Sequence, residues 1–126
     1  MLQARTNRGS NNTLNGSANE IRVKTETLDA VVSEDKIPSL IKIDVEGHEA
    51  EVLQGGKNTL SEIKPILIIE SFPPKQSTVL SLLDELGYHY IDADHHTSMN
   101  PKTTNLFAWH PQGPLDKATI QKLITL

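Results

Sequence analysis

The chain has 126 residues, enough for one modest domain with a single hydrophobic core. Its 12 Lys and Arg residues and 16 Asp and Glu residues give a net charge of −4, and no Lys- or Arg-rich run occurs, which argues against nucleic acid or an anionic membrane as a partner. Because cysteine is absent, disulfides, thiolate nucleophiles and cysteine-based zinc sites are excluded.

The first residues predict a segment that does not join the core. Residues 1–20 are mostly polar and rich in Asn, Ser, Gly and Thr, so we expect a flexible polar lead-in followed by one domain over residues 21–126. They lack the hydrophobic centre of a signal peptide, and no apolar stretch approaches the roughly 20 residues of a membrane span. We therefore expect a soluble, cytoplasmic protein.

The first predicted elements are short. In residues 21–25 apolar side chains alternate with charged ones, which predicts a half-exposed strand, and residues 28–32 predict a brief helical turn. The apolar run over residues 40–44 predicts a strand covered on both faces. From about Glu46 the apolar spacing changes to three or four residues, which predicts a helix broken or capped at Gly55-Gly56.

The second half of the chain repeats this alternation. Residues 66–70, ILIIE, predict another buried strand, and a helix follows that Ser77 can cap and Gly87 can end. Two strands and a last helix complete the pattern, over residues 88–92, over residues 105–110 and from Asp116. This order predicts an α/β fold. The strands over residues 40–44, 66–70 and 88–92 are expected to be parallel, and the final strand pair is expected to be an antiparallel hairpin.

Acidic residues follow two of the predicted strands. Asp44, Glu46 and Gly47 come after the first, and Glu70 ends the second. Ligands of open parallel sheets bind outside the carboxyl ends of the strands. A carboxylate at this edge can hold a substrate hydroxyl or take its proton, a glycine lets the backbone turn closely into the helix, and His48 can act as a base near neutral pH.

A structural role accounts for the same residues. Asp44 can cap the following helix, and Glu46 and Glu49 favour its positive N-terminal end. We predict no metal site in this cluster, because consecutive helical positions point in different directions. The pair His95-His96 lies in a polar loop, where histidines are more often solvated than functional. From the residues alone, both roles remain open.

Residues 40–70, LIKIDVEGHEAEVLQGGKNTLSEIKPILIIE, resemble the central motif of FkbM-type methyltransferases, with its I-K-x-D-x-E-G-x-E core and later K-P-x-L-x-x-E. The preceding VKTETLD is also similar to that family, and the resemblance covers residues 21–110. It implies a Rossmann-like class I methyltransferase sheet, with residues 40–44 as its fourth strand and residues 66–70 as its fifth. It also implies S-adenosylmethionine as cofactor and a hydroxyl of a small molecule or sugar as methyl acceptor.

The resemblance assigns roles at the carboxyl edge of the sheet. It implies that the acceptor hydroxyl is aligned and deprotonated by Asp44, Glu46 and His48. It implies that the cofactor is contacted by Asp44, Val45 and Gly47, and the substrate by Glu70.

The chain also departs from the family. Family members carry a strand and a Gly-rich turn for the cofactor upstream of the motif, and neither precedes Leu40 here. We therefore expect the carboxyl-terminal half of such an enzyme, a partial domain that is inactive alone. The strand over residues 40–44 would lie at a sheet edge, so we expect self-association through it. The alternatives are a non-catalytic α/β interaction or scaffold module, and a metal-dependent hydrolase that uses the acid and histidine cluster.

Overall fold

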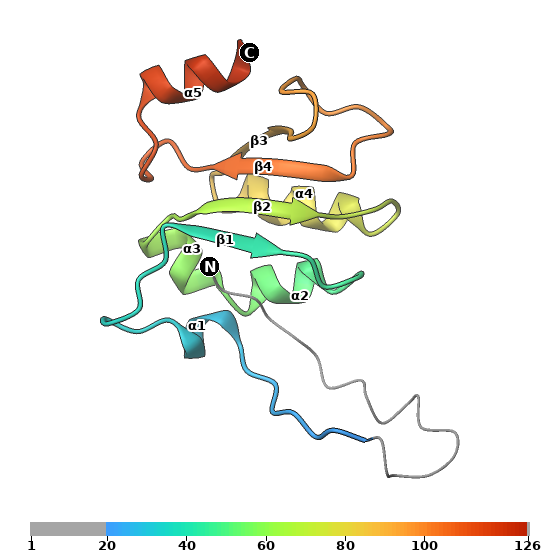
Figure 1. Ribbon diagram of the computed structural model, residues 1–126, viewed down its shortest axis with the longest axis vertical. Helices are drawn as coiled ribbons and strands as arrows, with labels where there is room; N and C mark the ends of the chain where they lie inside the picture. Colours follow the sequence, from blue (N-terminus) through green and yellow to red (C-terminus); the bar gives the residue numbers. More distant parts are fainter. Residues whose placement is uncertain (1–19, 126) are drawn as a thin grey trace.

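The computed structural model describes residues 20–125, so nearly all of the predicted lead-in lies outside the described residues. Within them the strands are β1 (Leu40–Ile43), β2 (Ile66–Glu70), β3 (His89–Asp92) and β4 (Asn105–Trp109). The helices are α1 (Leu28–Val31), α2 (Glu49–Gln54), α3 (Lys57–Glu62), α4 (Gln76–Glu85) and α5 (Lys117–Ile124). Figure 1 shows the strands stacked as one sheet, with α5 beyond β4 and α1 beyond α3.

The strands form one sheet in the order β1-β2-β4-β3. β1 pairs with β2 in parallel, and β4 pairs antiparallel with both β2 and β3. Consequently β1, β2 and β3 run in the same direction, and their carboxyl ends lie at one edge. The predicted α/β fold, the common direction of the first three strands and the final antiparallel pair are confirmed, with β4 inserted between β2 and β3.

The core lies on one face of the sheet. Ile41 and Ile43 of β1, together with the inward residues of β2 and β4, pack against α2, α3 and α4. The buried helix residues are Val52, Leu53, Leu60, Val79, Leu82 and Leu83. Each side chain of this kind contributes roughly 1.5–3 kcal/mol when it is removed from water. This layer fixes the strand ends, and with them the edge that carries the polar residues.

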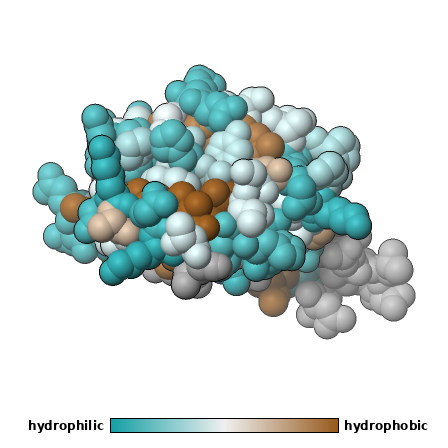
Figure 2. Space-filling model, turned by 90° about the horizontal axis from the view of Figure 1, so that it is seen from above, coloured by the Kyte–Doolittle hydropathy of each residue, from teal (hydrophilic) through white to brown (hydrophobic). Residues whose placement is uncertain are grey.

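The opposite face is open over β1. Leu40 and Lys42 are exposed, whereas Ile41 and Ile43 are buried. The prediction that this strand is covered on both faces is therefore wrong, because no described element packs over the outer side of β1. At the other end of the sheet, α5 lies over a small apolar cavity of about 170 Å³, lined by Ile68, Ile91, Ala93, His96, Phe107 and Leu123. Figure 2 views this end and shows a hydrophobic patch among hydrophilic side chains.

The predicted strand over residues 21–25 does not form. Residues 20–27 have no regular structure, and Ile21 is 72% exposed, because no described strand pairs with this segment. The helical turn that follows is confirmed as α1. Its Asp29 carboxylate accepts hydrogen bonds from the backbone N–H groups of Asn58 (3.1 Å) and Thr59 (2.8 Å), so α1 caps the start of α3.

Helix boundaries differ from the predictions at two places. The helix predicted from Glu46 begins at Glu49, after a turn with positive φ at Glu46 and Gly47. The interruption at Gly55-Gly56 is confirmed. Ser77 is not the cap of α4, because the helix begins one residue earlier and the Ser77 hydroxyl donates to the Pro74 carbonyl.

Two helix ends agree with the sequence. Gly87 follows α4 with φ of 82°, a conformation that glycine adopts without strain. Asp116 precedes α5 and accepts a hydrogen bond from the Thr119 N–H at 2.7 Å. This bond and a second one from the Thr119 side chain lower the pKa of the Asp116 carboxyl below its ordinary value. The last helix therefore begins where its capping residue predicts.

Candidate functional site

The turn after β1 is held by a buried acid. Glu49 is only 3% exposed, and its Oε2 accepts the Gly47 N–H at 2.7 Å. Glu46 has φ of 50° and Gly47 has φ of 99°, so the chain reverses tightly before α2 begins. From the sequence, Glu49 is expected only to favour the positive N-terminal end of the helix. Its additional role here is to fix the turn that presents Asp44 and Glu46.

Asp44 does not cap the helix. The N-cap of α2 is His48, whose side chain makes no capping hydrogen bond. The capping role weighed for Asp44 is therefore wrong, because the turn at Glu46 and Gly47 separates it from α2. Asp44 and Glu46 are exposed, and neither carboxylate has a hydrogen bond or ion pair within residues 20–125. Both are free to meet a ligand.

The other predicted residues of this turn, His48, Val45 and Gly47, are less exposed than the two acids. His48 is half-buried, and its Nδ1 lies 3.8 Å from Oε2 of Glu51, whose side chain is largely exposed. An exposed carboxylate at this distance orients an imidazole only weakly. Val45 and Gly47 are half-buried within the same turn. The structure thus keeps the predicted residues together on one short segment, with the two acids pointing into solvent.

Glu70 joins this segment from the next strand. Ile43 pairs with Ile69 in the parallel ladder, so the register brings Asp44 next to Glu70, on the face of the sheet opposite the core. Neighbouring strands lie about 4.8 Å apart. On its other side Glu70 is opposite Asn105 of β4. The two acids predicted from different strands therefore lie side by side at the carboxyl edge.

A small pocket lies beneath the turn. It has a volume of about 150 Å³ and is lined by Gly47, Glu49, Ala50, Glu51, Lys75, Thr78 and Val79. Lys75 Nζ donates to the Gly47 carbonyl at 3.3 Å. Sites that enclose small molecules usually have about 300–1,000 Å³. This pocket cannot enclose a nucleoside-sized cofactor, so the described residues offer such a ligand one wall.

The loop after β3 carries a second polar cluster at the same edge. Asp92 is 2% exposed, and its Oδ1 accepts the N–H groups of Asp94 and His95, both at 2.9 Å. Its Oδ2 accepts the Thr103 hydroxyl at 2.5 Å, and Nδ1 of His95 lies 3.1 Å from Oδ1. The Thr103 hydrogen bond is the main reason that the Asp92 pKa falls to about 2, and bonds from His95 and Asp94 lower it further against the effect of burial.

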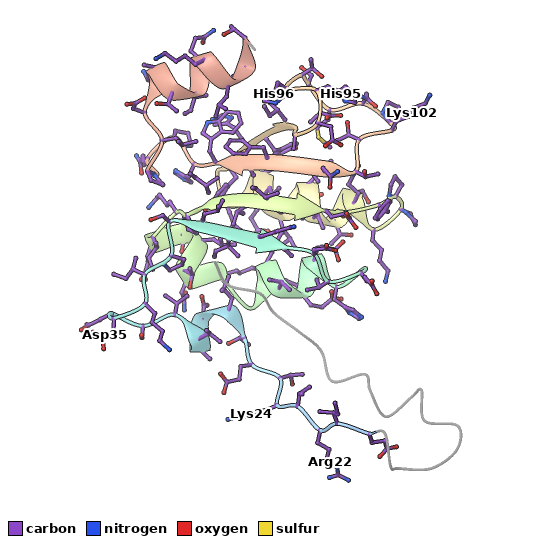
Figure 3. All side chains as sticks on the ribbon, viewed as in Figure 1. Arg22, Lys24, Asp35, His95, His96 and Lys102 are labelled. Carbon is purple, nitrogen blue, oxygen red and sulfur yellow. The ribbon has the colours of Figure 1, made fainter. Side chains whose placement is uncertain are left out.

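This cluster around Asp92 was not predicted from the sequence. The available signal was the same one used for Asp44 and Glu70, an acid at the end of a strand followed by polar residues. The contact with Thr103 could not be foreseen, because it joins residues across the loop that connects β3 and β4. Figure 3 shows His95, His96 and Lys102 on this loop, on the side to which β1 and β2 point.

Metal-ligand clusters and membrane-spanning helices are both absent from residues 20–125. Among residues 20–125, no three His, Asp or Glu side chains lie close enough together to hold a metal ion. The hydrolase alternative therefore gains no support from these residues. Among the helices of the same region, none has both the length and the hydrophobicity needed to span a bilayer.

Comparison with known proteins identifies the family. The sequence model of the Methyltransferase FkbM domain matches residues 2–90, which is more than half of the chain and includes β1, the acidic turn, β2 and α4. The chain therefore belongs to the FkbM methyltransferase family. Neither the curated proteins nor the solved structures gave a match. The predicted family is confirmed, and the mixed α/β fold is compatible with a methyltransferase-like domain.

Proposed function

We propose that this chain is part of an S-adenosylmethionine-dependent O-methyltransferase that acts on a hydroxyl of a small molecule or sugar. The observation that carries the proposal is the family match together with the free acids Asp44, Glu46 and Glu70 at one sheet edge. In a Rossmann-like sheet of class I type, this edge is where ligands bind. The cofactor, when bound, supplies an electrophilic methyl group.

The proposed roles follow from exposure and position. Asp44 contacts the cofactor and, with Glu46, orients it against the acceptor; Val45 and Gly47 supply the backbone of the same wall. Glu70 contacts the acceptor from the neighbouring strand. His48 is the candidate proton acceptor in this turn. Carboxylates suit these tasks because they accept hydrogen bonds from hydroxyl groups and balance the positive charge of a sulfonium.

The fit of the cofactor supports a divided site. The pocket at the turn is too small to enclose the cofactor, and no described strand covers the outer edge of β1. We propose that a further cofactor-binding segment lies against that edge in the active form, and that the chain alone transfers no methyl group. The incomplete class I sheet expected from the family is part of this proposal.

The proposal is tested by adding a cofactor-binding segment to the chain and measuring cofactor binding. The chain is titrated with S-adenosylmethionine by calorimetry, by itself and mixed with the amino-terminal cofactor-binding half of another FkbM-domain protein. We expect no measurable heat from the chain by itself, and binding together with transfer of a tritiated methyl group in the mixture. Absence of binding in both arrangements would contradict the proposal. Asp44→Asn in the mixture should weaken binding, whereas Asp35→Asn, in an exposed loop, should not.

A second proposal keeps the interaction-module alternative: the free edge of β1 pairs with β1 of a second copy. The Ser39 carbonyl accepts the Ile66 N–H, so alternate residues face β2, and the backbone groups of Leu40 and Lys42 point to the free edge. In an antiparallel pair centred on Ile43, Lys42 of each copy lies opposite Asp44 of the other, so two such contacts form. Centring the pair on Lys42 would instead place like charges opposite each other, which is destabilising.

Charge exchange tests this register. Sedimentation at high concentration should reveal a dimer of the wild-type chain. Lys42→Glu should dissociate it, because two acids would then face each other, and the double variant Lys42→Glu with Asp44→Lys should restore it. A wild-type chain that stays monomeric at high concentration, or a double variant no better than the single one, would contradict the proposed pairing.

A further inference from the structure

The loop after β3 holds an imidazole more firmly than the turn after β1. His95 Nδ1 lies 3.1 Å from a buried carboxylate, whereas His48 Nδ1 lies 3.8 Å from an exposed one. The Asp92 carboxylate is fixed in turn by two backbone N–H groups and the Thr103 hydroxyl. To form the turn after β3, the two backbone N–H bonds to Asp92 would be sufficient. The extra bond to Thr103 and the ring contact make Asp92 a rigid partner for His95.

The cluster is also anchored to the edge that carries Glu70. Gln76 donates to the Thr103 carbonyl at 2.6 Å and to the Ser71 carbonyl at 2.9 Å, so the start of α4 joins the loop to the end of β2. The Ser71 N–H donates to the Thr104 carbonyl at 2.8 Å. Asn105, opposite Glu70 in the sheet, donates to Asp94 at 3.0 Å. These contacts link the loop of His95, across β4, to Glu70 of the proposed acceptor site.

The proton positions follow from Asp92. Because its pKa is lowered to about 2, the carboxylate is ionised at neutral pH and can only accept hydrogen bonds. The ring nitrogen that faces it must therefore carry the proton in neutral imidazole. Nε2 is then left without a proton, and the His95 side chain is 72% exposed. An oriented ring with an open, unprotonated nitrogen is the arrangement of a general base.

We propose that His95, positioned by Asp92, accepts the proton of the acceptor hydroxyl in the methyl transfer. This inference rests on the proposed function and assigns to a different loop the role for which His48 was the candidate. As the hydroxyl oxygen bonds to the methyl carbon, the bond between that carbon and the donor sulfur breaks. The hydroxyl proton passes to Nε2 of His95. Asp92 remains ionised and stabilises the imidazolium, so it is a positioning residue.

The first test reads the imidazole directly. In long-range proton–nitrogen NMR spectra of the full chain, recorded well above the ordinary imidazole pKa of about 6.5, His95 should carry its proton on Nδ1. Asp92→Asn should remove that preference. Thr103→Val, which removes a neighbouring hydrogen bond but keeps the carboxylate, should retain the preference and is the control. A wild-type His95 protonated mainly on Nε2 would overturn the proposal, because that nitrogen could not accept a proton.

The second test measures whether His95 responds to a ligand that carries hydroxyl groups. Titration with methyl glucoside should shift the Nε2 resonance of His95 and leave that of His89 unchanged, since His89 lies at the amino end of the same strand. Absence of a shift at His95 would overturn the proposal. In the mixture that transfers methyl groups, His95→Gln should lower the rate by about 10²-fold or more, and His89→Gln should not. A full rate with His95→Gln would also overturn it.

These readouts separate two failures. If the mixture neither binds S-adenosylmethionine nor transfers its methyl group, the methyltransferase proposal fails, and the role of His95 in that reaction fails with it. If the mixture transfers but His95 has the wrong tautomer or does not respond to the glucoside, only the assignment of the base fails. The first outcome tests the cofactor site at the β1 edge, and the second tests the His95 site in the loop after β3.

Discussion

The turn after β1 and the loop after β3 lie at one edge of the sheet and differ in which side chains they leave exposed. In the turn, a buried glutamate holds the backbone and leaves Asp44 and Glu46 exposed, with no partner among residues 20–125. In the loop, the buried Asp92 satisfies its own oxygens and leaves His95 exposed. In both, a buried acid fixes the geometry and exposed residues remain available. Only the first pattern lies in the recognisable sequence motif.

The largest loss of stability is expected when the Thr103 hydroxyl is removed. Thr103→Val removes a hydrogen bond to an ionised carboxylate, so the free energy of unfolding should fall by roughly 1.5–3 kcal/mol. Thr97→Val is the control, because the Thr97 hydroxyl makes only a long 3.4 Å contact at the surface, and it should change stability by less than about 0.5 kcal/mol. Urea unfolding measures both. Equal effects of the two variants would show that the Asp92 cluster does not hold the loop.

The turn after β1 should respond to a change in the backbone. Gly47 has φ of 99°, and an added Cβ would lie 3.1 Å from Lys75 Nζ, so Gly47→Ala should lower the free energy of unfolding by about 1–2 kcal/mol. Glu46→Gly places glycine at the neighbouring positive φ and should cause no such loss. Thermal unfolding of the two variants distinguishes them. A neutral Gly47→Ala would mean that the turn is not constrained as described.

Acid should act on the loop through Asp92. The pKa of about 2 in the folded chain lies below the ordinary carboxyl value of 3.8, so the ionised carboxylate contributes stability that is fully present above about pH 4 and is lost as the pH falls toward 2. Urea unfolding should therefore show a fall in stability over this window. The fall should be smaller in Asp92→Asn. An identical pH dependence in the variant would contradict the contribution of Asp92.

The smallest stability effect is expected at Asp44. Its exposed carboxylate has no partner within residues 20–125, so Asp44→Asn should change the free energy of unfolding by less than about 0.5 kcal/mol. If the carboxylate holds the cofactor through a charge-assisted hydrogen bond, the same variant should weaken binding in the complemented mixture by about tenfold or more. Calorimetry and urea unfolding separate the two quantities. A destabilised variant would point to a structural role for Asp44.

The spacing of apolar residues predicted much of the fold. It failed where a segment needs a neighbouring strand or helix that the spacing does not reveal. The strands at Leu40, Ile66 and Asn105 and the helix before Gly87 were predicted because their apolar spacing reflects burial in one core. The alternation in residues 21–25 looks the same, yet no described strand pairs with it and none forms. Coverage of both faces of β1 failed for a similar reason, since an apolar sequence does not reveal which elements lie nearby.

The site was predictable to the extent that it lies in one segment. Asp44, Glu46 and Gly47 follow a strand directly, and Glu70 enters through the parallel register. The Asp92 cluster joins residues 11 positions apart across an irregular loop, and no periodicity encodes that contact. The start of α2 was displaced for a related reason: the Glu49 hydrogen bond to Gly47 stabilises a turn where the spacing alone favours helix.

NMR titration with S-adenosylmethionine shows which residues of the chain contact the cofactor. The backbone amides of the ¹⁵N-labelled chain are followed by NMR during titration with S-adenosylmethionine to high concentration, where binding to one wall of the site becomes detectable. We predict shifts concentrated at residues 44–47 and beside Glu70, with α5 unaffected. Shifts absent at this edge, or located elsewhere on the chain, would contradict the assignment of the carboxyl edge of β1 as a cofactor wall.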